Sequence, residues 1–280
     1  MKLRETLFCD TALAERIERA ETQLMADAAT AARHRRSGPP GFVIPVAGGA
    51  ASFAEPGSPL NKVAGLGFGG VPGTVELDGV EQAFAAVGAP AQVELAHVAD
   101  PAIGVFLTGR GYRLESFENV LGLALDREYA HVLPEGIEVR ASTDDDFERW
   151  LEVVGDGIAH PDAMGVPSHE EFPREVFENA MRDLVAAGVR RYAAVLGGVI
   201  AGGGSMRMAD GIAQLTGAAT APAHRRRGVQ TALLSARLAV AAAAGCDLAV
   251  VTTQPASKSQ QNAQRRGFAL LYTRAILVKP

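Results

Sequence analysis

The sequence contains few of the residues that define several protein classes. It has 2 cysteines, Cys9 and Cys246, among 280 residues. This argues against both a disulfide framework and a cysteine-based zinc site. The longest apolar stretches, such as "LAVAAAAG", are too short to span a membrane, and the first residues carry no signal-peptide core. We therefore expect a cytoplasmic protein that has no membrane partner.

The sequence also lacks an excess of basic charge. It has 27 basic and 32 acidic residues, and its net charge is −5. Because nucleic-acid binding depends on a basic surface, we expect no nucleic-acid partner. No P-loop pattern G-x-x-x-x-G-K-[ST] occurs. His160 and His169 have no third ligand placed by the sequence, so we expect no metal site.

What is present is a repeat. Residues 91–121 and 247–277 align without a gap. Each has an apolar strand, a short helix, an Arg-Gly-aromatic step and a second strand. The preceding segments also correspond, because a glycine- and alanine-rich strand, a proline and a helix occur in both. Fixed-period similarity of this kind indicates a duplicated unit. Pro134 and Gly136 interrupt the pattern, so we place the join at 129–135 and predict domains at 1–130 and 136–280.

Both halves are predicted to alternate strands with helices, which is typical of α/β units. In the first half we expect a helix over 10–34, followed by one or two strands in "FVIPVAGGAASFA". In the second we expect a strand in "GIEVRAST", a helix capped by Ser142 or Thr143, and a helix in "REVFENAMRDLVAAG". Three strands then follow, with hairpin turns at Gly197-Gly198 and Asp210-Gly211.

The stretch "TAPAHRRRGVQTALL" carries the most specific signal. Pro222 ends the preceding strand, Gly228 frees the backbone at the turn, and a strong helix former follows. A helix N-terminus already offers unpaired N–H groups and partial positive charge. Arginines and a glycine at that point make a phosphate site. The alternative is that the arginines only solubilise the helix start.

This order of elements, with Arg225-Arg226-Arg227-Gly228-Val229-Gln230 at the loop, resembles the GNAT superfamily of acyl-CoA-dependent N-acetyltransferases. The resemblance covers residues 137–280. It implies two GNAT-like α/β units, each a mixed, largely antiparallel twisted sheet flanked by helices. Gln230 departs from the small residue usual in the family signature, and we expect it to crowd the loop.

The resemblance implies that acetyl-CoA is the co-substrate. Its pyrophosphate would bind the loop and helix start, and its pantetheine arm would pair with the preceding strand. Ser259 and Asn262, three apart on one helix face, would hydrogen-bond the cofactor, although a polar surface helix is the other interpretation. The cofactor-binding residues implied are Ala218, Ala219, Thr220, Arg225, Arg226, Arg227, Gly228, Val229, Gln230, Thr231, Ser259 and Asn262.

The catalytic residues are less defined. Many family members carry a tyrosine that reprotonates the leaving thiolate, and the matching position here is Ala263. Tyr272, on the following strand, is a candidate substitute, or else a core aromatic. The amine must lose a proton before attack. Candidates are Gln214 acting through a water, or side chains of the loop after the first helix of this half, namely His160, Asp162, His169, Glu170 and Glu171.

The first half has "VPGTVELD" where the second has the basic loop. Glu76 and Asp78 there would repel a pyrophosphate, although acidic residues stabilise a helix start. We therefore expect the first half to be a degenerate, non-catalytic copy. The sequence as a whole predicts an N-acetyltransferase that moves an acetyl group to a primary amine of a small molecule or peptide. The alternative is a non-catalytic acyl-CoA-binding or protein-interaction module.

Overall fold

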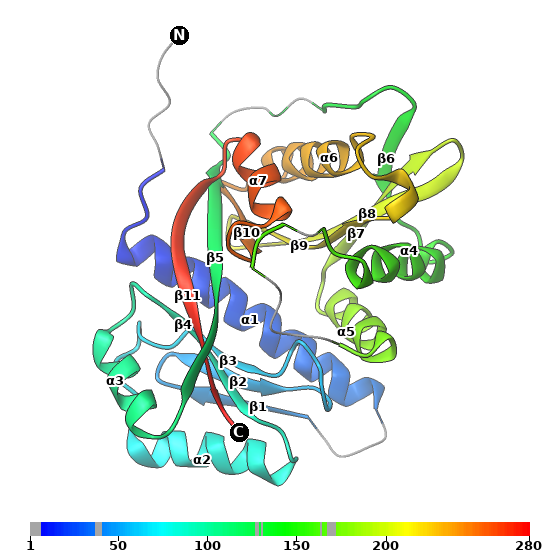
Figure 1. Cartoon of the computed structure of the whole chain (residues 1–280). Coiled ribbons are helices and arrows are strands. Elements are labelled where there is room, and N and C mark those ends of the chain that lie inside the picture. Colours follow the sequence, from blue (N-terminus) through cyan, green and yellow to red (C-terminus); the bar gives the residue numbers. More distant parts are fainter. Residues whose placement is uncertain (1–6, 37–40, 127–128, 130, 163, 167–171) are drawn as a thin grey trace. The chain divides into compact units, whose positions relative to one another are not determined.

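The computed structural model describes residues 7–36, 41–126, 129, 131–162, 164–166 and 172–280 (Figure 1). The described chain forms two compact units that interleave along the sequence. The α1 unit contains the described residues of Phe8–Val120, helix α5 (Arg174–Ala186) and Leu271–Pro280. The α6 unit contains Leu7 and the described residues of Leu121–Val166 and Gly188–Leu270.

The α1 unit begins with the long helix α1 (Thr11–Arg35), for which the Asp10 carboxylate accepts a hydrogen bond from the Leu13 N–H at 2.8 Å. Its other elements are β1 (Phe42–Val46), β2 (Gly49–Phe53), β3 (Lys62–Ala64), α2 (Thr74–Ala86), β4 (Ala91–Ala96), α3 (Pro101–Gly109), most of β5 (Arg113–Ala124) and most of β11 (Ala269–Lys279). The strand order is β1-β2-β3-β4-β11-β5. Only the β3/β4 pair is parallel among the registered pairs of this unit.

The core of the α1 unit includes a buried charge network. On β11, Tyr272 donates its hydroxyl hydrogen bond to the Glu18 carboxylate of α1 at 2.6 Å, and Arg274 Nε donates to the same oxygen at 2.8 Å. Arg274 Nη1 also lies 3.4 Å from the Glu94 carboxylate of β4. Because each of these side chains is at most 2% exposed, the network ties the last strand to the helix and to β4.

The α6 unit contains β6 (Ile137–Ala141), α4 (Phe147–Ala159), β7 (Arg190–Leu196), β8 (Val199–Ala209), β9 (Ile212–Thr220), a 3₁₀ turn (Pro222–His224), α6 (Val229–Ala243), β10 (Leu248–Thr253) and α7 (Lys258–Arg265). The strand order is β5-β10-β9-β8-β7-β6. The pairs from β9 to β6 are antiparallel, whereas β9 and β10 run parallel.

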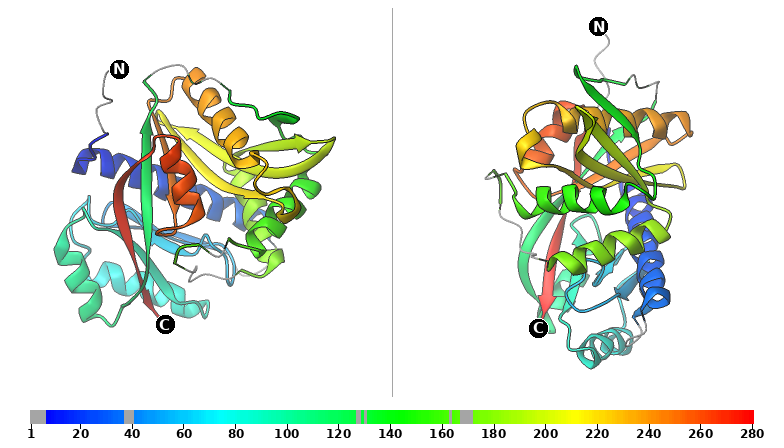
Figure 2. Two further views of the ribbon diagram at one scale, coloured as in Figure 1. Left: turned by 45° about the horizontal axis from the view of Figure 1, so that its top comes forward. Right: turned by 90° about the vertical axis from the view of Figure 1, so that its right-hand side faces the viewer.

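Helices cover both faces of this second sheet (Figures 1 and 2). Two successive glycines of β8 show the two faces, because successive residues of a strand point in opposite directions. A Cβ on Gly203 would meet Trp150 of α4, whereas a Cβ on Gly204 would meet Arg237 of α6. Trp150 also donates its ring N–H to the Tyr192 carbonyl at 3.0 Å. The glycines of β8 therefore let α4 and α6 approach the sheet closely.

The fold class predicted from the sequence is confirmed, since each unit is a mixed, largely antiparallel sheet with flanking helices. The helix expected to start at Ser142 or Thr143 begins later, with Asp146 at its N-cap. Asp146 accepts hydrogen bonds from the Thr143 N–H at 3.0 Å and from Arg140, which holds Ser142–Asp145 outside the helix. The consecutive domains 1–130 and 136–280 describe the order of the repeat and stay a prediction. The α1 unit differs from the predicted first domain, because it also contains α5 and the end of β11.

Candidate functional site

The parallel strands β9 and β10 diverge inside the α6 unit. Their register pairs are Ile212 with Leu248, Ala213 with Ala249 and Gln214 with Val250. Beyond that point β9 continues to Thr220 and β10 to Thr253 without further pairing between them. The facing backbone groups of the diverging part are therefore outside the ladder and can pair with an extended ligand.

A β-bulge lies on β9 within the diverging part. Thr216 pairs with Ser205 and Ala219 pairs with Gly203, so β9 has one residue more than β8 across this step. Gly217 takes a φ of 40°, which glycine adopts without strain. Ala218 is exposed, and Ala219 and Thr220 are buried. The bulge turns this end of β9 away from the regular ladder.

The loop after β9 leads into an uncapped helix start. Gly228, the N-cap of α6, has φ 88° and ψ 5°, and it has no side chain that could cap the first turn. A Cβ at Gly228 would lie 2.6 Å from Cγ of Pro134, so glycine is required both for the backbone angle and for space. The N–H groups of Val229, Gln230 and Thr231 at this end remain available to an anion.

The three arginines of this loop differ in their surroundings. Arg225 donates to the carbonyl oxygens of Gly157 at 3.2 Å and of His160, at the end of α4. Its side chain therefore anchors the loop to α4. Arg226 and Arg227 are exposed, and Arg226 has a φ of 62°. Their side chains, unlike that of Arg225, are therefore mostly open to solvent.

Gln230 is also engaged within the site. Its Nε2 donates to the Thr220 hydroxyl at 3.0 Å, which links the first turn of α6 to the end of β9. The side chain that departs from the family signature therefore lies against a residue expected to line the cofactor. We expect a cofactor arm that pairs with β9 either to break this hydrogen bond or to pack against it.

Helix α7 carries the next predicted residues. Its N-cap is Ser257, whose hydroxyl accepts from the Gln260 N–H at 3.2 Å. Ser259 is exposed and Asn262 is half-buried. Ala263, at the position of the family tyrosine, is 4% exposed and belongs to the core under α6.

The candidate catalytic residues fall in different places. Gln214 is 5% exposed and sits at the last paired position before β9 and β10 diverge. Tyr272 is 2% exposed in the core of the α1 unit, where it donates to Glu18, and burial, together with the Glu18 charge, raises its pKa. This geometry corresponds to the second interpretation of Tyr272, that of a core aromatic residue.

The loop candidates are only partly described. His160 is exposed, and its Nδ1 lies 3.2 Å from the Asp156 carboxylate. Asp162 is exposed, and its carboxylate lies 3.9 Å from Arg225. His169, Glu170 and Glu171 lie outside the described residues. Within the described ranges, no three His, Cys, Asp or Glu side chains are grouped as metal ligands, and no helix is long and apolar enough to cross a membrane.

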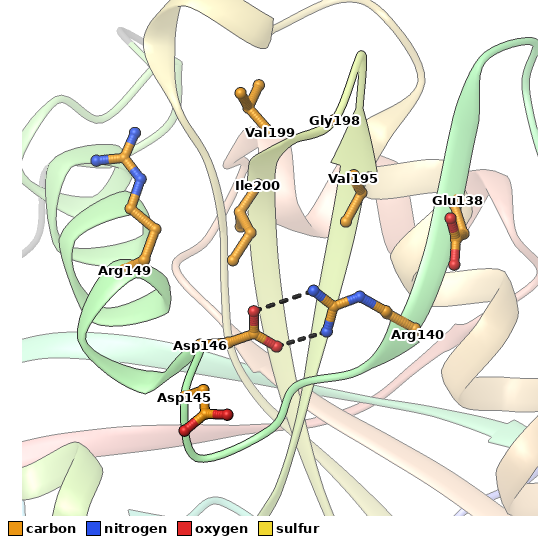
Figure 3. Close-up of a pocket in the computed structure, with 9 residues that line it drawn as sticks. All are labelled: Glu138, Arg140, Asp145, Asp146, Arg149, Val195, Gly198, Val199 and Ile200. Atoms are coloured by element: carbon orange, nitrogen blue, oxygen red, sulfur yellow. Dashed lines mark hydrogen bonds and ion pairs between the residues drawn. The ribbon is translucent and has the colours of Figure 1, made fainter.

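A surface pocket of about 330 Å³ lies elsewhere on the α6 unit, at the edge formed by β6, β7 and β8 and the start of α4 (Figure 3). Arg140 and Asp146 face each other across it as an ion pair, and Asp145 and Arg149 lie at its rim. None of its nine lining residues is a predicted site residue. The pairing of Arg140 with Asp146 holds the pKa of this carboxyl well below its usual range, as expected for a structural contact at a helix start.

Sequence reasoning missed three polar residues near the site. Arg237 lies inside an alanine- and leucine-rich helix and is 3% exposed; its isolation in that apolar run was the available signal. Thr253 is the last residue of β10, beyond the point where the strands diverge, and Gln254 follows it. Oγ1 of Thr253 and Oε1 of Gln254 are buried and have no hydrogen-bond partner in the described part of the chain. No periodicity distinguished these two from an ordinary strand end.

The equivalent loop of the α1 unit is closed by its own side chain. Glu76, in the first turn of α2, accepts hydrogen bonds from the N–H groups of Gly73 at 3.2 Å and of Ala47 at 2.8 Å. Asp78 is paired with Arg110. Glu76 therefore forms its half of a capping box with Gly73 and places a carboxylate in the first turn of this helix.

Comparison with known proteins identifies the kind of domain that these features form. Residues 158–268 match the model of the Acetyltransferase (GNAT) family. This segment, which contains the diverging strands, the basic loop and α7, belongs to that family, and the chain as a whole has the tandem GNAT fold. No curated protein matches the chain in sequence.

Several solved structures share the fold. A GCN5-related N-acetyltransferase from Kribbella flavida is 19% identical with a TM-score of 0.66, and the alignment covers 97% of both chains. A tandem GNAT protein from the clavulanic acid biosynthesis pathway is 14% identical with a TM-score of 0.60, again over 97% of both chains. A GCN5-related N-acetyltransferase from Sphaerobacter thermophilus is 17% identical with a TM-score of 0.55, over 73% of this chain and 65% of that one. At these identities the likeness is one of fold.

Proposed function

We propose that the protein is an acetyl-CoA-dependent N-acetyltransferase acting on a primary amine of a small molecule or peptide. The observation that carries the proposal is the divergence of β9 and β10 beside an uncapped helix start. Free strand edges suit the amide-rich pantetheine arm, and a helix N-terminus suits a pyrophosphate. Both lie within the segment that belongs to an acetyltransferase family.

The cofactor would lie along one continuous set of residues. The pantetheine arm would follow β9 at Ala218–Thr220, where small side chains leave the strand edge accessible. The pyrophosphate would bind the N–H groups of Val229–Thr231, with charge from Arg226 and Arg227. Ser259 and Asn262 on α7 would hydrogen-bond the same molecule. Arg225 contributes indirectly, because its side chain holds the loop against α4.

The reaction would proceed by direct attack. The neutral amine nitrogen would form a bond to the thioester carbonyl carbon, and collapse of the tetrahedral intermediate would break the C–S bond. Gln214, at the point where the strands separate, would hold a water that accepts the amine proton. No cysteine lies in the loop, which fits a route without a covalent acyl-enzyme.

The α1 unit would hold no acyl-CoA. Glu76 places a carboxylate in the first turn of its helix and binds the N-cap N–H, and Asp78 adds negative charge beside it. Displacing an internal carboxylate and approaching a second one would both oppose a pyrophosphate. We therefore infer one acetyl-CoA per chain, bound by the α6 unit.

A specific observation favours a second candidate, a non-catalytic acyl-CoA-binding module. Ala263 stands where the family tyrosine protonates the thiolate, and Tyr272 is committed to Glu18. In that case acetyl-CoA would bind without being consumed. The two candidates share a binding site and differ only in turnover.

A thiol-release assay with acetyl-CoA and a panel of primary amines separates them. Amine-dependent release of free thiol by the wild type, lost in Arg226→Glu/Arg227→Glu, would support catalysis at this loop. Arg190→Glu is the control for arginine reversal as such, since it makes one such change, half the charge change of the double variant, at an exposed position of the same unit. Binding without release across the panel would favour the second candidate.

A further inference from the structure

Arg237 is a buried cation that the proposed reaction does not yet use. It lies on α6 and is 3% exposed. Its hydrogen bonds all go to backbone carbonyl oxygens: Nε donates to Leu233 at 3.2 Å, and Nη1 donates to Ser205 at 2.9 Å and to Thr216 at 3.4 Å. In the described part of the chain no carboxylate lies within ion-pair distance of this guanidinium.

Such a side chain is costly to keep in an apolar helix. Moving a cation out of water is unfavourable unless partners compensate for it. Burial lowers the pKa of Arg237 to about 10, so the group is still charged at neutral pH. A leucine or methionine would fill the same space without that cost, which suggests that the guanidinium has a positional role.

The two strand carbonyl groups that Arg237 binds, those of Ser205 and Thr216, lie at one side of the β-bulge. Ser205 and Thr216 are register partners, and their hydroxyl groups are 2.8 Å apart. The next register pair is Gly203 with Ala219, so Gly204 lies opposite the extra residue of β9. A Cβ at Gly204 would come within 3.0 Å of Cζ of Arg237, so the glycine makes room for the guanidinium.

We propose that Arg237 is a positioning residue of the acyl-binding site, which holds the β9 bulge so that the Gly217 N–H faces the acyl carbonyl. The inference rests on the proposed function. The guanidinium fixes the Thr216 carbonyl, and the rigid, planar peptide unit then fixes the direction of the Gly217 N–H.

The charge of Arg237 also acts through the peptide unit between Thr216 and Gly217. A carbonyl group that accepts a hydrogen bond from a cation polarises its peptide unit and makes the N–H at the other side a stronger donor. Donors that are held in place before the reaction stabilise an oxyanion because they need not reorganise. Arg237 would therefore favour ligands that carry an acyl oxygen over ligands that lack one.

Calorimetric titration of the full chain with acetyl-CoA and with CoA tests this directly. We expect the wild type to bind acetyl-CoA more tightly than CoA by about fivefold to tenfold, the value of one good hydrogen bond. Arg237→Met should lose most of that preference while binding CoA within about twofold of the wild type. Arg237→Lys, which keeps the charge, should restore part of the preference.

Arg191→Met is the matched control. Arg191 is also a buried arginine of this unit, but its side chain donates to the Thr143 carbonyl at 3.1 Å and pairs with Asp144 rather than with β9. This variant should keep the acetyl-CoA preference even if it is less stable. Hydrogen exchange of residues 212–220 in the free protein gives a second readout, and it should be faster in Arg237→Met than in Arg191→Met.

If Arg237→Met does not fold, Gly204→Ala takes its place, because the added methyl group displaces the guanidinium by a few tenths of an ångström. It should reduce the acetyl-CoA preference and leave CoA binding unchanged. A preference retained in the folded variants would overturn the inference, as would equal losses for both ligands or equal affinities in the wild type. Failure of the wild type to bind either ligand would instead refute the proposed function.

Discussion

Two glycines of the same helix should respond to the same substitution in opposite directions. Gly155 and Gly157 both lie within α4. A Cβ at Gly155 would have nothing within 4 Å, whereas one at Gly157 would lie 2.8 Å from Cβ of Ala219 and 2.9 Å from the Thr220 carbonyl oxygen. Gly157 therefore allows α4 to contact the end of β9 where the cofactor arm is expected.

The magnitudes follow from two opposing effects. Glycine to alanine in a helix interior stabilises by about 1 kcal/mol, so Gly155→Ala should raise the free energy of unfolding by up to about that amount. At Gly157 the same gain is opposed by overpacking against backbone, which costs about 1–3 kcal/mol. The two variants should therefore differ by about 1–3 kcal/mol, with Gly157→Ala the less stable.

Urea unfolding of the two variants and the wild type measures this difference. Gly157→Ala should also weaken acetyl-CoA binding, because α4 must move away from Ala219 and Thr220. Gly155→Ala should bind like the wild type. Equal stabilities for the two variants would refute the close approach of α4 to β9.

Two further predictions concern the α1 unit. Glu81 is partly desolvated, but hydrogen bonds from Arg110 and Lys279, the latter at 2.7 Å, hold its pKa below the ordinary 4.5. The stability that this carboxylate contributes is present above pH 4.5 and is lost as the pH falls through the lowered pKa. The stability of the wild type should therefore fall more steeply in acid than that of Glu81→Gln. Thermal unfolding of both proteins across pH measures this difference. Arg274→Met should cost about 3–5 kcal/mol in urea unfolding, because Glu18 is left as a buried charge, and adding Glu18→Gln should recover part of this loss. A cost below that of an ordinary surface substitution would show that the network does not hold β11.

Local sequence signals predicted most elements of the second half of the chain. The hairpin glycines expected at Gly197-Gly198 have φ values of 60° and 80°, and Asp210-Gly211 has 50° and 76°. The helix expected in "REVFENAMRDLVAAG" is α5, Arg174–Ala186. These features depend on neighbours in the chain, so turn chemistry and helical periodicity were sufficient to find them.

The interleaving of the two units could not be predicted. The repeat gives β5 and β11 the same apolar pattern, so periodicity does not tell which unit either strand joins. The choice depends on tertiary contacts such as those of Glu18 with Tyr272 and Arg274, which are 254 and 256 residues apart in sequence. For the same reason the sequence left Tyr272 as a candidate acid, because its hydrogen bond to Glu18 of α1 is a long-range contact.

For the candidate site, the sequence predicted the loop and the helix start but not the hydrogen-bond partners of each side chain. The run of arginines predicted positive charge at a helix N-terminus, yet it did not show that Arg225 is bound to carbonyl groups of α4. The bulge opposite Gly204 and the role of Arg237 beneath it arise from packing between a helix and two strands. One helix residue in a chain of alanines and leucines carries too little pattern to reveal them.

The most direct test of this account is the stoichiometry and location of acetyl-CoA binding. Calorimetric titration of the wild type should give one site per chain, and Arg226→Glu/Arg227→Glu should abolish it while Arg190→Glu leaves it intact. Glu76→Gln, in the closed loop of the α1 unit, should leave the wild-type site unchanged. Binding that survives reversal of both loop arginines would contradict the assignment of the cofactor to the start of α6, and no binding by the wild type would contradict the acetyltransferase function itself.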